Sequence, residues 1–234
     1  MDSSNAVAVY CGSSIGTEKA FSHAATSLGH ALADANRPMV YGGGSKGIMG
    51  IVSGAVLERG GKVTGIVPYA MVAAGGEGVK ASSQVNVVLD EAGREKIEHV
   101  VVDSMHERKV EMARRSAGFI GLPGGFGTFE EVLEVTTWTQ LGIHNKPVIL
   151  LNVCSFFEPL RQLIDNGVSY GFIKPLSKSI IIFVDGPKER SEHESFNWGE
   201  AALKALDAWD RDAGDALFDW SARMEGRSTP LQST

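Results

Sequence analysis

Three segments of the sequence combine glycines with small polar residues in a way that suits an anion. They are residues 11–14, 42–50 and 123–128, and each lies between an apolar segment and a predicted helix. A strand, a glycine turn and a helix N-terminus present free backbone N–H groups and the positive end of the helix dipole. Phosphate is the usual ligand of such a turn. Any one turn could serve only tight packing of a strand against a helix, but three together favour a phosphorylated ligand.

The second turn also has the glycine spacing of a dinucleotide-binding fingerprint. Gly42, Gly44 and Gly47 fit G-x-G-x-x-G, but this turn follows the second predicted strand rather than the first. The third predicted strand, residues 62–67, is followed by no acidic residue that could bind a ribose hydroxyl. The turn also lacks the spacing of a Walker A motif. We therefore expect neither NAD binding nor the chemistry of a P-loop NTPase.

Arg108 is an unusual charge because it interrupts the apolar stripe of a predicted helix. Together with Val101, Met105 and Met112 it follows the i, i+4, i+7, i+11 spacing of one helix face. Burial of an unpaired guanidinium costs much free energy, so Arg108 should face an anion. That anion is either a carboxylate of the protein or a group of a bound ligand. Lys109 lies at the edge of the same stripe.

Glu130 and Glu131 are the candidate acids of the third turn. Thr128 and Glu131 have the spacing of a capping box, in which the glutamate accepts the N–H of the residue that caps the helix. The same helix start coincides with the glycine turn. A carboxylate there could instead position a water or stabilise positive charge that develops on a sugar. The sequence leaves both roles open.

Short apolar segments alternate with longer amphipathic ones along the chain. Strands that are apolar throughout and separated by helices predict a parallel sheet with both faces covered, which binds ligands at the carboxyl ends of its strands. We predict one Rossmann-like, doubly wound α/β domain over residues 1–223, with a mostly parallel sheet of about seven strands and helices on both faces, and a disordered tail at residues 224–234. Strands are expected at residues 6–10, 39–41, 62–67, 85–89, 118–122, 147–151 and 180–184. Helices are expected at residues 17–36, 48–59, 94–116, 129–142, 156–166 and 198–209.

The composition is that of a globular protein with an excess of glycine. The chain has 234 residues, of which 28 are glycine and 43% are hydrophobic. Its net charge of −6 gives no overall attraction to nucleic acid or an anionic membrane, so we expect neither partner. Cys11 and Cys154 are too few for a disulfide framework or a cysteine zinc site, and no metal is expected. We see no secretory signal and no apolar segment long enough to span a bilayer, which predicts a cytoplasmic protein.

The glycine turns, the arginine and the glutamates together resemble the Lonely Guy family of cytokinin-activating phosphoribohydrolases. The resemblance covers about residues 6–184, and its motifs occur in order. The family motif P-G-G-x-G-T-x-x-E is matched in full at residues 123–131. Residues 42–50 and the Met-His-Glu-Arg-Lys segment at residues 105–109 match as well, and residues 137–144 look like the helix that follows.

The resemblance implies hydrolysis of the N-glycosidic bond of an N6-modified adenosine 5′-monophosphate. The products are the free base and ribose 5-phosphate, no cofactor takes part, and relatives form homodimers or larger assemblies. Arg108 and Glu131 are then the catalytic pair, and the turn at residues 124–128 holds the 5′-phosphate. The resemblance places further substrate contacts at Ser13, Gly43, Gly44, Glu77, Met105, Lys109, Gly124, Gly125, Phe126, Gly127, Thr128, Glu130 and Thr137.

Two other functions remain open on the same sequence. One is a broader purine nucleoside 5′-monophosphate glycosidase that acts on AMP. The other is a non-catalytic carrier of a nucleotide or cofactor, which the molybdenum-cofactor carriers of this fold resemble. The presence of both Arg108 and Glu131 favours an enzyme. Sequences of this kind have also been labelled lysine decarboxylases, but nothing here indicates a pyridoxal phosphate site.

Overall fold

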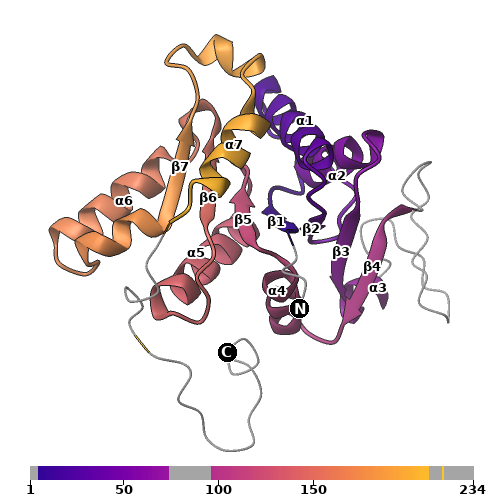
Figure 1. The fold of residues 1–234 in the computed structure, drawn as a ribbon, viewed down its shortest axis with the longest axis horizontal. Helices are drawn as coiled ribbons and strands as arrows, with labels where there is room; N and C mark the ends of the chain where they lie inside the picture. The colour runs from indigo at the N-terminus through magenta and orange to yellow at the C-terminus, as the bar shows by residue number, and fades with distance from the viewer. Residues whose placement is uncertain (1–4, 74–95, 211–217, 219–234) are drawn as a thin grey trace, which may run out of the picture.

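A computed structural model of the chain describes residues 5–73, 96–210 and 218, which are arranged around one seven-stranded sheet (Figure 1). All neighbouring strands are parallel, and their order is β4-β3-β2-β1-β5-β6-β7. This confirms the predicted α/β fold class. The strands are β1 (Val7–Tyr10), β2 (Met39–Tyr41), β3 (Val63–Pro68), β4 (Glu98–Val102), β5 (Gly118–Gly121), β6 (Val148–Asn152) and β7 (Ile181–Asp185).

Helices cover both faces of this sheet. The first face lies under α1, α2 and α7, where Leu28, Val52 and Trp198 join one apolar cluster. The second face lies under α4, α5 and α6, where Met112 and Val132 belong to another cluster. The helices are α1 (Lys19–Asp34), α2 (Gly47–Glu58), α3 (Tyr69–Ala73), α4 (Met105–Arg115), α5 (Phe126–Leu141), α6 (Glu158–Ser169) and α7 (Trp198–Asp207), with short 3-10 turns η2 (Val153–Ser155), η3 (Pro175–Ile180) and η4 (Arg190–Glu194).

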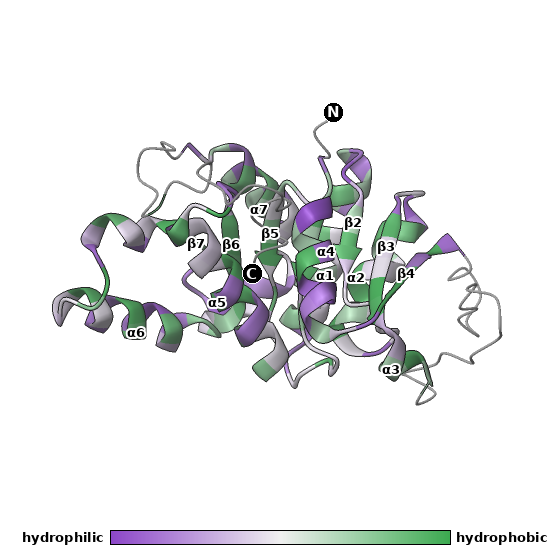
Figure 2. Cartoon of the chain, turned by 90° about the horizontal axis from the view of Figure 1, so that it is seen from below, coloured by the Kyte–Doolittle hydropathy of each residue, from purple (hydrophilic) through white to green (hydrophobic). Residues whose placement is uncertain are grey.

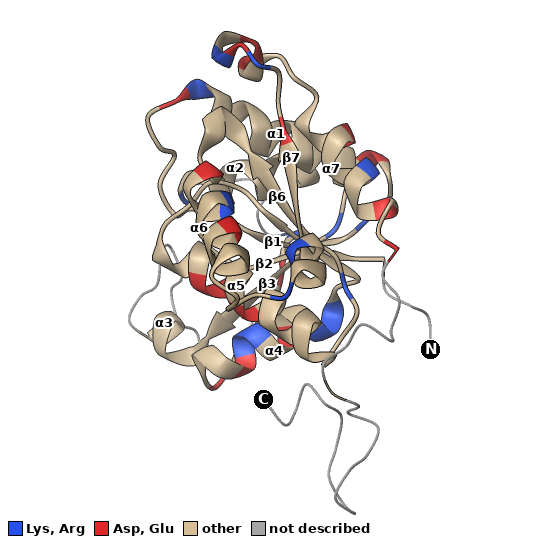
Figure 3. Cartoon of the chain, turned by 90° about the vertical axis from the view of Figure 1, so that its left-hand side faces the viewer, with Lys and Arg blue, Asp and Glu red and all other residues tan. Residues whose placement is uncertain are grey.

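The middle strands are apolar on both faces because both faces are covered. Every residue of β1, β2, β5 and β6 is buried, and the sheet appears mostly green in the hydropathy colouring of Figure 2. Charged residues lie mainly on the helices and the connecting segments around it (Figure 3). No helix within the described ranges is both long and apolar enough to cross a bilayer.

The chain reverses direction across the sheet between β1 and β5. It moves outward from β1 through β2 and β3 to β4, and then returns to place β5 on the other side of β1. The loops that follow β1 and β5 therefore leave the sheet at a topological switch point, which is where doubly wound sheets bind their ligands. The first and third glycine turns are these two loops.

The prediction of one long helix over residues 94–116 was wrong. The structure places the edge strand β4 in its first half and begins α4 only at Met105. Three consecutive valines favour a strand, and Ser104 then caps α4 by accepting the backbone N–H of Glu107 at 3.0 Å. The expected strand at residues 85–89 and the tail at residues 224–234 lie outside the described residues.

Candidate active site

A cavity of about 340 Å³ opens at the carboxyl ends of the strands, beside the switch point. The three glycine turns, which are far apart in the sequence, all reach it. The catalytic candidates Arg108 and Glu131 also line it, together with several apolar side chains. The full lining is Val9, Cys11, Gly12, Ser13, Gly42, Gly43, Gly44, Met49, Val67, Met71, Met105, Arg108, Gly125, Phe126, Gly127, Thr128, Glu130 and Glu131.

The third turn aims the start of α5 at this cavity. Gly125 has an extended backbone and caps the helix, so α5 begins at Phe126. The first N–H groups of a helix have no partner within it, and residues 126–128 line the cavity. Gly124 must be a glycine because a Cβ there would lie 2.1 Å from the hydroxyl oxygen of Thr128. The arrangement provides backbone donors and the positive end of the helix dipole for an anion.

The predicted capping box is absent from α5. Because the helix begins two residues before Thr128, that threonine is a buried residue of the first turn rather than the cap. No side chain caps this helix by a hydrogen bond. Glu131 consequently lies in the second turn, and it lines the cavity. The Glu131 carboxylate therefore does not cap α5.

Arg108 and Glu131 form an ion pair that is almost closed to solvent. An NH2 nitrogen of the arginine lies 3.5 Å from Oε1 of the glutamate, and the two side chains are 12% and 11% exposed. Gly42 makes room for the guanidinium, because a Cβ at that position would lie 2.0 Å from the NH2 nitrogen. Among the described residues, the buried Nε of Arg108 has no hydrogen-bond partner. The arginine therefore has donor capacity left for a ligand anion.

The surroundings of Glu131 tune its acidity for proton transfer. Burial raises the pKa of this carboxyl to about 7, although the charge of Arg108 opposes the shift. The charge of Glu130 also raises this pKa, and that of Lys109 lowers it. A carboxyl group with a pKa near neutrality can take up and release a proton at physiological pH. Such a shifted group in a cleft is typical of a functional site.

Lys109 acts beside the cavity rather than in it. Its Nζ donates to Oε1 of Glu130 at 2.5 Å and to Oε1 of Glu134 at 3.0 Å. Glu130 lines the cavity, whereas Lys109 does not. The lysine thus fixes Glu130 and supplies positive charge near Glu131 without facing the ligand space.

The structure brings together most of the predicted site, with three exceptions besides Lys109. Thr137 lies on the exposed side of α5, where its hydroxyl donates to the carbonyl of Leu133 at 2.9 Å, away from the cavity lining. Gly124 borders an adjoining hollow. Glu77 lies outside the described residues. Within the residues that the structure describes, no three His, Cys, Asp or Glu side chains are grouped closely enough to hold a metal ion.

The cavity lining also contains residues that the sequence did not assign to the site, namely Gly42, an apolar wall, and Val9, Cys11 and Gly12 of β1 and the first turn. Gly42 was part of the glycine pattern, but its role depends on Arg108, which lies 66 positions away in the chain (108 − 42). The wall consists of Met49, Val67 and Met71, from α2, β3 and α3. Met49 comes after β2, Val67 lies at the carboxyl end of β3 and Met71 comes just after that strand. These positions were a usable signal, because the carboxyl ends of all strands lie at this edge.

Known proteins resemble this chain in sequence and in fold. The family described as "Possible lysine decarboxylase" matches residues 49–193. The probable cytokinin riboside 5′-monophosphate phosphoribohydrolase LOGL2 of Oryza sativa subsp. japonica is 46% identical over 186 residues, which cover 80% of this chain and 70% of the relative. The cytokinin riboside 5′-monophosphate phosphoribohydrolase LOG5 of Arabidopsis thaliana is 46% identical over 183 residues, which cover 78% and 74%.

Solved structures with the same fold are more distant in sequence. The molybdenum cofactor binding protein of Rippkaea orientalis has a TM-score of 0.59 at 18% identity, with 89% of this chain and 98% of that chain covered. The molybdenum cofactor carrier protein of Chlamydomonas reinhardtii has a TM-score of 0.54 at 18% identity, with 87% and 98% covered. At these identities the likeness establishes the fold alone.

Proposed function

Since the chain belongs to the Lonely Guy family of cytokinin riboside 5′-monophosphate phosphoribohydrolases, we propose that it hydrolyses the N-glycosidic bond of N6-modified adenosine 5′-monophosphates. The products are the free cytokinin base and ribose 5-phosphate. The observation that carries this proposal is the buried Arg108–Glu131 pair at the edge of a glycine-lined cavity. That cavity combines a base of suitable pKa with backbone donors for a phosphate.

The 5′-phosphate occupies the start of α5 in this proposal. The N–H groups of residues 126–128 and the helix dipole bind it, and the donors left on Arg108 hold phosphate or ribose oxygens. The apolar wall of Met49, Val67 and Met71 surrounds the remaining, less polar part of the nucleotide. The phosphate thereby fixes the ribose so that its C1′ lies near Glu131.

Glu131 supplies the chemistry at the ribose in this scheme. As the bond between C1′ and the purine nitrogen breaks, its electrons leave with the base, and the sugar gains oxocarbenium character. The Glu131 carboxylate stabilises this positive charge and accepts a proton from the attacking water. The water oxygen then forms the new bond to C1′, and the leaving nitrogen takes a proton from solvent. No cofactor is needed for this balance.

The older family description as a possible lysine decarboxylase has no counterpart in the cavity. Pyridoxal phosphate enzymes hold their cofactor through a lysine Schiff base. Of the described residues that line the cavity, none is a lysine, and Lys109 beside it is engaged with two glutamates. This composition supports hydrolysis rather than decarboxylation.

One assay tests the proposal against its alternatives. The protein is incubated with N6-isopentenyladenosine monophosphate, AMP and the corresponding nucleosides, and the released base and ribose 5-phosphate are measured by chromatography. We expect release from the N6-modified monophosphate and none from the nucleosides. Equal rates on AMP would indicate a broader monophosphate glycosidase. No product from any nucleotide, with nucleotide binding retained, would indicate a carrier.

We further propose that the protein acts as a homodimer in the cytoplasm, without nucleic acid or membrane as partners. The resemblance to the family supports the dimer, and the net charge of −6 supports the absence of polyanionic partners. Light scattering coupled to gel filtration measures the assembly directly. A monomer at micromolar concentration would contradict the dimer.

A further inference from the structure

A left-handed turn follows β6, outside the cavity. Cys154 has a φ of 52° and Ser155 has a φ of 60°. This region of backbone conformation favours glycine, and two consecutive residues with side chains seldom adopt it. Such a conformation persists only where surrounding contacts hold it. We call residues 154–155 the left-handed turn.

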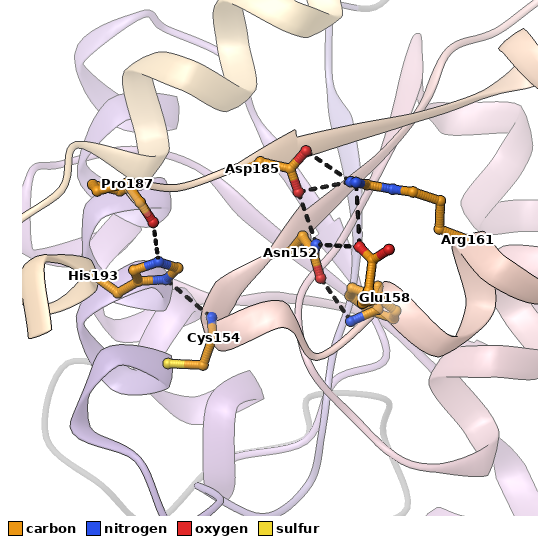
Figure 4. Close-up of polar contacts among 8 residues, drawn as sticks. Asn152, Cys154, Glu158, Arg161, Asp185, Pro187 and His193 are labelled. Carbon is orange, nitrogen blue, oxygen red and sulfur yellow. Dashed lines mark hydrogen bonds and ion pairs between the residues drawn. The ribbon is translucent and has the colours of Figure 1, made fainter. Parts of the chain in front are cut away.

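Two side chains accept backbone N–H groups on either side of this turn, one at its first residue and one at the second residue after it (Figure 4). Nδ1 of His193 accepts the backbone N–H of Cys154 at 3.0 Å, and its Nε2 lies 2.8 Å from the carbonyl oxygen of Pro187. A carbonyl can only accept, so Nε2 carries the proton and the ring is neutral. On the other side, Oδ1 of Asn152 accepts the backbone N–H of Phe157 at 2.8 Å. His193 and Asn152 are called the clamp below.

Both members of the clamp are themselves fixed. Nδ2 of Asn152 donates to Oδ1 of Asp185 at 2.8 Å, and Arg161 binds the two carboxylate oxygens of that aspartate at 2.6 and 2.8 Å. His193 is buried against Trp198, with ring centroids 5.3 Å apart. The Trp198 indole also donates to the backbone carbonyl of His193 at 3.0 Å. The clamp thus joins β6 to β7, η4 and α7.

The left-handed turn leads directly into Phe156, which lies behind the third glycine turn. The Phe156 ring stacks on Phe129 of α5 at a centroid distance of 6.1 Å and meets Phe21 of α1 edge-on at 6.2 Å. It also lines a second hollow of about 260 Å³ together with Gly124 and Gly125. This hollow shares part of its lining with the candidate active site. A shift of Phe156 would therefore remove support from the start of α5.

We propose that His193 and Asn152 are positioning residues for the phosphate-binding start of α5. The clamp holds the left-handed turn, the turn holds Phe156, and Phe156 packs against the first turns of α5 through Phe129. The identity of the ligand in this inference rests on the proposed function. The clamp acts on nucleotide binding more than on the chemical step, since its polar contacts do not include the catalytic pair.

The first variant to test is His193→Leu. It removes the acceptor of the Cys154 backbone N–H and replaces the imidazole by an apolar side chain of similar size. We expect the KM for N6-isopentenyladenosine monophosphate to rise about five- to tenfold while kcat changes less than about twofold. The inhibition constant of ribose 5-phosphate should rise in parallel, because it reports binding at the same phosphate site. Asn152→Leu should give the same pattern. The matched control is His30→Leu, since His30 pairs with Glu58 away from the site.

Rescue by glycine separates positioning from plain packing. Glycine adopts the left-handed conformation without steric cost. The double substitution Cys154→Gly with Ser155→Gly therefore lets the turn keep its conformation without the clamp. When His193→Leu is made in that glycine background, its KM should stay within about twofold of that of the unmodified protein. If His193→Leu lowers Tm but leaves KM unchanged, the residue only packs the core and the proposal is wrong. A raised KM that the glycines fail to restore also contradicts it.

The unmodified protein separates this inference from the proposed function. If it releases no base in the same assay, the proposed function fails. The clamp is then tested by the Kd of AMP from calorimetry on the same variants. An unchanged Kd in His193→Leu contradicts the clamp, and a Kd raised by about five- to tenfold and restored by the glycines supports it.

Discussion

The guanidinium of Arg108 and the carboxylate of Glu131 are both almost buried, and each changes the behaviour of the other. Burial alone would keep the glutamate protonated, because charge is costly in a low-dielectric environment. The arginine 3.5 Å away opposes that effect, and the pKa of the carboxyl settles at about 7. The pair therefore holds a base that is ionised in a large fraction of molecules near neutral pH, although it is shielded from water.

Removal of either member of the pair should abolish most of the activity. Glu131→Gln keeps the shape but cannot accept a proton, and we expect kcat to fall about 10²- to 10⁴-fold. Arg108→Ala removes the buried guanidinium and should cost a similar factor. Initial rates and thermal unfolding by circular dichroism measure both effects. Arg114→Ala is the control, because that arginine pairs with Glu111 on the surface, and its rate should be unchanged. Full activity in Glu131→Gln would exclude the assigned role.

The pH profile should show the titration of Glu131. The ionised carboxylate is the active form, and a group with a pKa of about 7 loses its proton as the pH rises through that value. The logarithm of kcat/KM should accordingly rise with a slope of about one below this pH and level off above it. Glu131→Gln should retain no such limb in its residual rate. A profile that is flat from about one pH unit below this pKa to about one unit above it would contradict Glu131 as the base.

At the scale of elements, the turn after β2 determines where the arginine of α4 can lie. The place that a Cβ of residue 42 would occupy is filled by the guanidinium of Arg108. The glycine is thus required by a contact between two elements, rather than by the conformation of its own backbone. Replacement of one hydrogen of Gly42 by a methyl group should displace a catalytic side chain that belongs to α4.

Gly42→Ala should lower kcat about 100-fold, because a displacement on the order of 1 Å at a catalytic group can cost that much. Gly54→Ala is a matched control on the neighbouring helix α2, where a Cβ meets nothing within 4 Å. The control should keep its rate and gain about 0.5 to 1 kcal/mol of stability, since alanine is the better helix former. Steady-state kinetics and chemical denaturation of the two variants provide the comparison. Equal rates in both would show that Arg108 tolerates a side chain at residue 42.

Local patterns predicted the helices and strands well and the contacts between them poorly. Six of the predicted strands overlap strands of the structure, because buried parallel strands are uniformly apolar. The helix expected over residues 94–116 failed because its first half contains consecutive valines whose pairing with β3 decides their conformation. The capping box failed because the same Thr-x-x-Glu spacing also fits a helix that begins at Phe126.

The candidate site could be predicted from the sequence as a set of residues but not as a geometry. The glycine turns and Arg108 stood out because each departs from the pattern of its own segment. The requirement at Gly42 and the ion pairs of Lys109 remained hidden, since they depend on which strands become neighbours in the sheet. The order of strands carries this information, and no window of local sequence contains it.

At the scale of the whole molecule, the proposed substrate and the protein carry charge of the same sign, because both are anionic at neutral pH. The net charge is −6, and the charged residues are spread over the helices around the sheet rather than gathered on one basic face (Figure 3). Attraction must therefore come from short-range donors in the cavity, namely backbone N–H groups and one arginine. Interactions of this kind are screened by salt much less than those between surface charges.

Ligand-induced stabilisation should follow the phosphate rather than the base. A ligand that binds only the folded state at 100 times its Kd adds about 2.7 kcal/mol to the free energy of unfolding. For a chain of this size that corresponds to a rise in Tm of roughly 5 to 10 °C. We expect such a rise from ribose 5-phosphate, and little from adenosine at the same concentration, by differential scanning fluorimetry. The rise should persist at 0.15 M salt and should shrink in Arg108→Ala, because the donors that it reports are buried. A larger shift with adenosine would place most of the binding free energy on the base and would contradict the assignment of the start of α5 to the phosphate.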